Sequence, residues 1–213
     1  FCMKEEELYA LIDEIIPDHP IALTDIPEVD LYIDQVTEFI ENKLSIHKRH
    51  QKDKLLTKTM INNYAKAGIL MPPKRKRYSR QHIALLLLLY NSKQILSIND
   101  ISLLFSALQK PVDTHNDTEQ PNSYLIDLVY ELMQEINNAH ADQLKKFCEE
   151  KMELIQGKTA QVEDEKKESI RWFLMAMSLV SQAAMQKRLA ETIIDRYFQN
   201  DTLRKERQKG KSG

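Results

Sequence analysis

Glycine and cysteine are scarce in this sequence, and their scarcity narrows the choice of fold. Only four glycines and seven prolines occur in 213 residues. So few turn-forming residues disfavour a β-sandwich or barrel and favour long helices with short connections. The two cysteines, Cys2 and Cys148, are too few for a disulfide framework or a metal cage, so we expect ordinary thiols in a reducing compartment. The expected fold class is all-α, mainly helical.

Long apolar runs are also missing. The longest, "IALLLLLY" at 83–90, is far shorter than the ~18–20 residues that cross a bilayer, so it indicates a core helix. The first residues, "FCMKEEELYALIDEII", are acidic where an export signal is basic. From these two observations we expect no membrane partner and a cytoplasmic location.

A balanced net charge hides a strongly basic segment. The chain carries a net charge of −2, but twelve lysines and arginines lie between Lys43 and Arg80 against the single acid Asp53. That segment therefore carries +11, and the remaining residues sum to −13. A basic segment with so few acids is typical of a surface that binds an acidic polymer, although a solvated basic face is the simpler alternative.

Helical periodicity divides the first half of the chain into short helices. Apolar residues at helical spacing predict helices over 4–16 and 29–46. Thr57 stands at the N-cap of a third helix, residues 57–67, and Gly68 stands where that helix needs a left-handed residue to end. Its outer face would carry lysines, asparagines and threonines but no acid. Two more helices follow, one starting near Ser79 and one over 97–108.

The second half of the chain indicates two long amphipathic helices, over 122–156 and 165–200, that form a hairpin around a turn at Gly157 and "KTAQVED". The predicted domains are an N-terminal helical domain over 1–110 and a hairpin over 122–200 for dimerisation or signal reception. A polar linker over 111–121 joins them, and a basic disordered tail over 201–213 follows.

Three successive stretches resemble a known pattern. "LTKTMINNYAKAGILMPP", "KRYSRQHIALLLLL" and "LSINDISLLF" are similar to the DNA-binding domain of MerR-type transcription regulators. The matching positions are Thr57, Tyr64, Gly68, Ile69, Leu70, Pro72, Arg77, Tyr78, Ser97, Asp100 and Ile101. The chain also looks like an uncharacterised bacterial family, a domain of unknown function. The likeness covers about residues 55–108 and implies a winged helix-turn-helix with a short β-wing, in a bacterial cytoplasm.

The resemblance implies binding of duplex DNA by a homodimer at a roughly palindromic site. Helix 57–67 would enter the major groove, and the basic wing over 72–78 would contact phosphates. MerR-type proteins have an arginine followed by an aromatic residue where this chain has Asn62 and Asn63. Asparagine pairs in bidentate fashion with an adenine edge, so we expect base contacts there. The predicted DNA-binding residues are Thr57, Lys58, Thr59, Asn62, Asn63, Tyr64, Lys66, Lys74, Arg75, Lys76, Arg77, Tyr78 and Arg80.

Alternative interpretations stay open. A solvated helix face would also explain the two asparagines, and core packing would explain Tyr64. A helical adaptor could use the basic patch to bind an acidic protein or a membrane surface, and "PPKRKR" alone resembles a nuclear-import signal. We predict neither an enzyme nor a cofactor, because no catalytic constellation stands out. We also predict no metal site, since His47 and His50 have no further ligands near them. The effector, if one exists, is not indicated.

Overall fold

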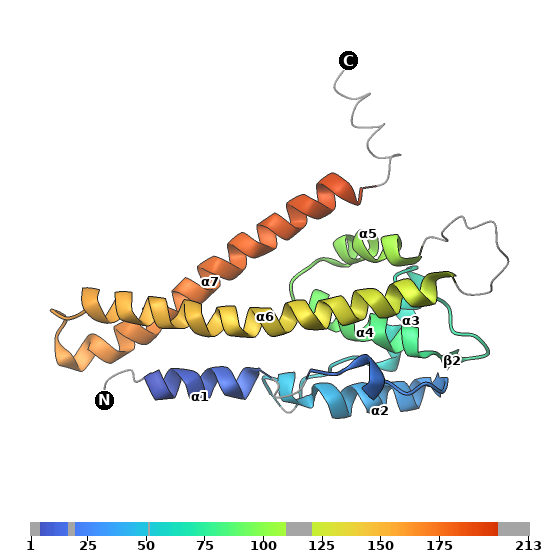
Figure 1. The fold of residues 1–213 in the computed structure, drawn as a ribbon, viewed down its shortest axis with the longest axis horizontal. Coiled ribbons are helices and arrows are strands. Elements are labelled where there is room, and N and C mark those ends of the chain that lie inside the picture. The colour runs from blue at the N-terminus through green and yellow to red at the C-terminus, as the bar shows by residue number, and fades with distance from the viewer. Residues whose placement is uncertain (1–4, 17–19, 51, 110–120, 200–213) are drawn as a thin grey trace, which may run out of the picture. The chain divides into compact units, whose positions relative to one another are not determined.

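The computed structural model describes residues 5–16, 20–50, 52–109 and 121–199, and these residues are mainly helical, as predicted. Figure 1 traces the helices in chain order. The α-helices are α1 (Glu5–Ile15), α2 (Ile33–Leu44), α3 (Lys58–Lys66), α4 (Arg80–Ser92), α5 (Ile98–Gln109), α6 (Pro121–Lys158) and α7 (Asp164–Tyr197). Two strands, β1 (Leu31–Tyr32) and β2 (Arg77–Tyr78), form an antiparallel sheet, and 3-10 turns lie at Leu23–Asp25 and Ser45–His47.

The chain divides into two compact units. Unit 1 contains residues 1–20 and 133–186, and unit 2 contains residues 21–132 and 187–213. This division differs from the predicted domains, because α6 runs through the point at which the units separate. The predicted linker over 111–121 and tail over 201–213 fall outside the described residues, apart from Pro121, which begins α6.

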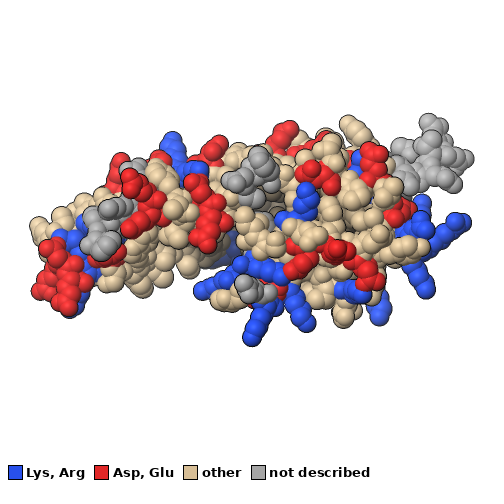
Figure 2. Space-filling view, turned by 90° about the horizontal axis from the view of Figure 1, so that it is seen from below, with Lys and Arg blue, Asp and Glu red and all other residues tan. Residues whose placement is uncertain are grey.

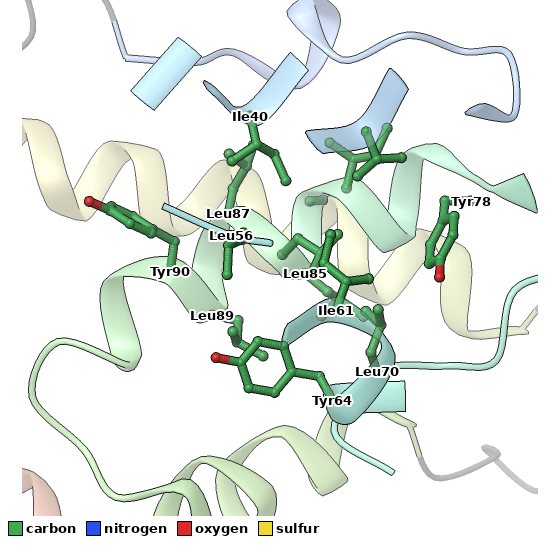
Figure 3. Close-up of a cluster of buried hydrophobic side chains, with 14 of the residues drawn as sticks. Ile40, Leu56, Ile61, Tyr64, Leu70, Tyr78, Leu85, Leu87, Leu89 and Tyr90 are labelled. Atoms are coloured by element: carbon green, nitrogen blue, oxygen red, sulfur yellow. The ribbon is translucent and has the colours of Figure 1, made fainter. Parts of the chain in front are cut away.

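Unit 2 is organised around α4. Eight of the thirteen residues of α4 are buried, including almost all of the leucine run, so this helix has neighbours on nearly every side. Figure 3 shows Leu85, Leu87 and Leu89 of α4 among side chains from α2 and α3. Each fully buried leucine contributes roughly 1.5–3 kcal/mol, so burial of the run "IALLLLLY" stabilises the unit considerably.

The first turns of α6 belong to the same core. Ile126 and Tyr130 are each only 1% exposed and lie in the cluster that surrounds α4. The Tyr130 hydroxyl also donates a hydrogen bond to the carbonyl of Ile21, at 2.8 Å. Unit 2 thus joins residues that lie more than a hundred positions apart in the sequence.

Unit 1 has a smaller core made by α1, α6 and α7. Its buried apolar residues are Leu8, Ile12, Cys148, Met152, Ile155 and Met175. Cys148 is a buried thiol, as predicted, and burial raises its pKa further from the reactive range. Cys2 lies outside the described residues.

The turn between α6 and α7 lies at residues 159–163, within the predicted stretch, while Gly157 and Lys158 are the last two residues of α6. Ile155, two residues before Gly157, packs in the unit 1 core near the end of α6. Arg171 of α7 also contacts the connection between the two helices, because its Nε donates to the Thr159 hydroxyl at 2.8 Å.

No helix within the described residues is long and apolar enough to cross a membrane.

Candidate nucleic-acid interface

Helix α3 begins and ends where the sequence predicts. The Thr57 hydroxyl accepts a hydrogen bond from the backbone N–H of Met60, at 3.2 Å, and so caps the first turn. Gly68 follows the helix with φ +69°, a left-handed conformation that suits glycine. The N–H groups of Ile69 and Leu70 then both donate to the carbonyl of Tyr64, which closes the helix end.

The inner face of α3 is fixed by the core. Ile61 is fully buried and Tyr64 is 8% exposed, and Figure 3 shows both beside Leu85 and Leu89 of α4. Because this face of α3 packs against the core, the opposite face of the helix is exposed to solvent. That outer face carries Lys58, Thr59, Asn62, Asn63 and Lys66, all exposed, and no carboxylate. Within the described residues, neither asparagine amide has a hydrogen-bond partner, so both are available to a ligand.

The basic stretch after Pro73 forms a tight turn. Arg77 N–H donates to the carbonyl of Lys74 at 2.9 Å, and these two residues form an antiparallel bridge. Arg75 and Lys76, between them, have φ values of 51° and 63°. Two successive positive φ values are typical of a type I′ turn, in which Asn-Gly is the preferred sequence. Here two long basic side chains occupy those positions, and all four residues of the turn are exposed.

The segment that runs from β1 into the first turn of α2 contacts both this turn and the start of α3. Tyr32 pairs with Arg77 across the sheet, and the Arg77 guanidinium lies 4.9 Å from the Tyr32 ring centre and donates to its hydroxyl at 3.1 Å. Two residues further on, Asp34 forms an ion pair with Lys58, the first residue of α3. The sequence does not reveal Tyr32 or Asp34 as part of this surface, because both contacts join distant parts of the chain.

Three of the predicted contact residues have contacts within the chain. Tyr78 is 2% exposed, and its ring meets the His82 ring edge-on at 5.6 Å. Tyr64 also packs in the core, and burial raises the pKa of both tyrosines. Arg80 binds Asp127 of α6 at 2.6 Å, so its charge is already neutralised.

Acidic residues from distant positions also pair with part of the basic segment. Lys43 lies 3.9 Å from Asp25, and Lys48 and Lys58 pair with Glu41 and Asp34. On the face shown in Figure 2, acidic side chains lie among the basic ones. Within the described residues, the cations of the segment that lack an ion pair are Arg49, Lys52, Lys54, Lys66, Lys74, Arg75, Lys76 and Arg77. These ion pairs offset part of the +11 charge of the segment. The cations that remain unpaired lie on α3, on the turn and on the residues before α3.

No group of three or more histidine, cysteine, aspartate or glutamate side chains that could hold a metal ion occurs in the described part of the chain. Of the two histidines considered in the sequence, His50 is exposed, and the side chain of His47 lies outside the described residues.

These features define a helical domain with an outward, acid-free helix face and an exposed basic turn. The chain belongs to the family described as Domain of unknown function (DUF1836), which it matches over residues 21–133. This range coincides with the first of the two segments of unit 2, residues 21–132. Neither the comparison with curated proteins nor that with solved structures found a match.

Proposed function

We propose that unit 2 binds duplex DNA through the outer face of α3 and the turn over residues 74–77, in the manner of a MerR-like winged helix-turn-helix regulator. The main support for this proposal is that the same short segment of the chain contacts both α3 and the turn. An exposed helix face without acids and a turn of four basic residues are both held by one short segment, since Tyr32 of β1 binds Arg77 and Asp34 at the start of α2 binds Lys58. The turn takes the place of the wing.

The side chains on these two elements suit the two tasks of DNA recognition. Asn62 and Asn63 are exposed on neighbouring positions of α3, and an asparagine amide matches the N6 and N7 atoms of adenine in the major groove. Lys66 on the helix and the cations of the turn would bind phosphates, which position the protein without reading sequence. Lys58 would exchange Asp34 for a phosphate at little cost, because exposed ion pairs are worth about 0–1 kcal/mol.

The strain in the turn supports a role for its charges. A left-handed conformation costs a residue other than glycine roughly 1–2 kcal/mol, and Arg75 and Lys76 both adopt it. Asparagine and glycine would fit these positions with less strain. Two cations at these strained positions are explained if binding requires their positive charge, even though they make the turn less stable.

We expect the DNA-bound form to be a homodimer. Helix α7 exposes several large apolar side chains, among them Phe173 and Leu189, which are 63% and 62% exposed. With about 4 phosphate contacts per protomer, the logarithm of the binding constant should fall against the logarithm of salt concentration with a slope near −7 for the dimer. Sedimentation equilibrium measures the protomer number, and a monomer on DNA would halve this slope.

The experiment that tests DNA binding uses a variant that removes charge from the turn without unfolding it. The double variant Arg75→Asn, Lys76→Gly installs the preferred type I′ residues, so it should fold at least as stably as the parent. It should nevertheless bind duplex DNA more weakly, with the salt slope falling to about −3.6. Fluorescence anisotropy on DNA fragments selected by the purified protein measures both quantities.

The matched control removes the same charge from unit 1. Lys158 and Lys166 are exposed there and form no ion pair within the described residues, so Lys158→Gln, Lys166→Gln should leave the affinity and slope unchanged. If both double variants weaken binding equally, only net charge matters. If the parent binds DNA without any dependence on salt, the proposal is wrong.

A second pair of substitutions separates base reading from simple electrostatic attraction. Replacing Asn62 and Asn63 with alanine leaves the charge unchanged and removes the amides that would bind bases. The variant should lose discrimination between selected and random DNA by roughly 1–3 kcal/mol for each adenine that it no longer recognises. Unaltered selectivity would favour the adaptor hypothesis, in which the basic surface recognises any acidic partner.

A further inference from the structure

Unit 2 contains a hollow that the proposed DNA surface does not use. It has a volume of about 460 Å³ and lies between the residues that lead into α3 and the C-terminal end of α4. A volume of this order suits a small organic molecule. Its lining consists of Lys48, Arg49, Asp53, Lys54, Leu55, Tyr90, Asn91, Lys93 and Gln94.

The lining is strongly basic. Four cations and one carboxylate give it a formal charge of +3, and one of these cations, Lys48, is paired with Glu41 of α2. The carboxylate is already used within the chain: Asp53 accepts a hydrogen bond from the N–H of His50 at 2.9 Å and donates its own N–H to the carbonyl of the same residue. Arg49 and Lys54, by contrast, form no ion pair within the described residues. The hollow therefore contains donors for an anion that the chain does not itself supply.

Two of the residues that line the hollow, Leu55 and Tyr90, are held in place by packing in the core. Leu55 and Tyr90 are 3% and 5% exposed, and Figure 3 shows Tyr90 at the end of α4. The Lys93 ammonium lies 5.0 Å from the Tyr90 ring centre and donates to the carbonyl of Leu55. Burial lowers the pKa of Lys93, which means that this cation has lost part of its hydration. An anion beside it would restore the favourable electrostatic environment of the charge.

We infer that this hollow binds a small phosphorylated ligand. A phosphate dianion matches the excess of positive charge, and a guanidinium together with ammonium groups is the usual set of donors for phosphate. The Asn91 and Gln94 amides can hydrogen-bond the rest of such a molecule, because amides both donate and accept. Leu55, which lines the hollow, lies two residues before Thr57, the N-cap of α3. A bound ligand would therefore contact the segment that positions the proposed DNA-reading helix. This last connection rests on the proposed function, whereas ligand binding does not.

Calorimetric titration of the full chain tests the site without DNA. The probes are inorganic phosphate and adenosine diphosphate, titrated in chloride buffer up to millimolar concentrations. We expect the diphosphate to bind, and Arg49→Gln, Lys54→Gln to weaken that binding at least about tenfold, since two charge-assisted hydrogen bonds are removed. Both residues are exposed, so this variant should fold normally. Lys93→Gln should weaken binding as well, and its folding is checked by circular dichroism.

The control is Lys66→Gln, which removes a cation from the outer face of α3 and should change the affinity for the diphosphate less than about twofold. Absence of binding by both probes overturns the inference, and so does equal binding by the parent and the Arg49, Lys54 variant.

A phosphate could also come from the DNA backbone, and a titration with duplex DNA separates the two sources. If the Arg49, Lys54 variant loses affinity for DNA while the parent binds neither small probe, the hollow is a backbone contact and the small-ligand inference fails. A protein that binds the diphosphate but no DNA would leave this site in place and refute the proposed function alone.

Discussion

The ion pair between Arg80 and Asp127 joins α4 to the first turns of α6. Removing it tests whether these turns are part of the family domain. The Arg80 guanidinium and the Asp127 carboxylate are 2.6 Å apart, and their side chains are 29% and 16% exposed. Gln81 also donates to this carboxylate, at 3.2 Å. One carboxylate from α6 thus holds two side chains of the first turn of α4.

Replacement of Asp127 by asparagine should destabilise unit 2 by about 2 kcal/mol. Hydrogen bonds to charged groups contribute about 1.5–3 kcal/mol, and the partial exposure of Arg80 favours the lower half of that range. The variant also leaves the Arg80 charge without its partner, which adds to the destabilisation. Glu28→Gln is the matched control: Glu28 lies 4.0 Å from the same guanidinium but is 89% exposed, so we expect a change below about 0.5 kcal/mol.

Urea unfolding followed by circular dichroism measures the change, with Arg80→Gln and the double variant completing a thermodynamic cycle. The only tryptophan, Trp172, lies in unit 1, so its fluorescence separates unfolding of unit 1 from that of unit 2. We expect a coupling energy of about 1–2 kcal/mol and an unchanged fluorescence transition. A coupling energy near zero would refute the conclusion that this ion pair ties α6 to the domain.

Three other perturbations have defined outcomes. Burial lowers the pKa of His82 below its ordinary value of 6.5, so the unfolded chain binds more protons below that pH. Stability measured by urea unfolding should then decline as pH falls below 6.5, by at most about 1.4 kcal/mol per pH unit, and His82→Gln should remove this contribution. Gly68→Ala should cost about 1–2 kcal/mol in the same assay, because φ is +69° although there is space for a methyl group. Arg171→Met should lower the midpoint of the Trp172 fluorescence transition, since it removes the buried hydrogen bond to Thr159.

The parts of the fold that the sequence predicts are those that local interactions decide. The ends of α3 depend on Thr57 and Gly68, which act within one turn of themselves, so both ends are predictable from the sequence. The leucine run of α4 indicates a fully buried helix for the same reason. Gly157 and the polar residues after it likewise indicate the end of α6, which the structure places one residue past the glycine.

The candidate surface is harder to predict because its contacts are not local. Tyr32 and Arg77 are 45 positions apart, and Arg80 and Asp127 are 47 apart. No periodicity or spacing links such residues, so the sequence could not show that Arg80 is already paired. Tyr78 is buried in the core of unit 2 and pairs with Leu31, a contact that also joins distant segments.

The basic segment is continuous in the sequence, but the fold divides its charge into separate surfaces. Acids on α2 neutralise Lys48 and Lys58, while the outer face of α3 and the turn lack any carboxylate of their own. Arg49 and Lys54 line instead the hollow beside α4. A solvated basic face would need no such division, since charge spread evenly over a surface serves solubility equally well. The separation of an acid-free helix face from a basic hollow is therefore the reason to test a polymeric and a small anion as two ligands of one domain.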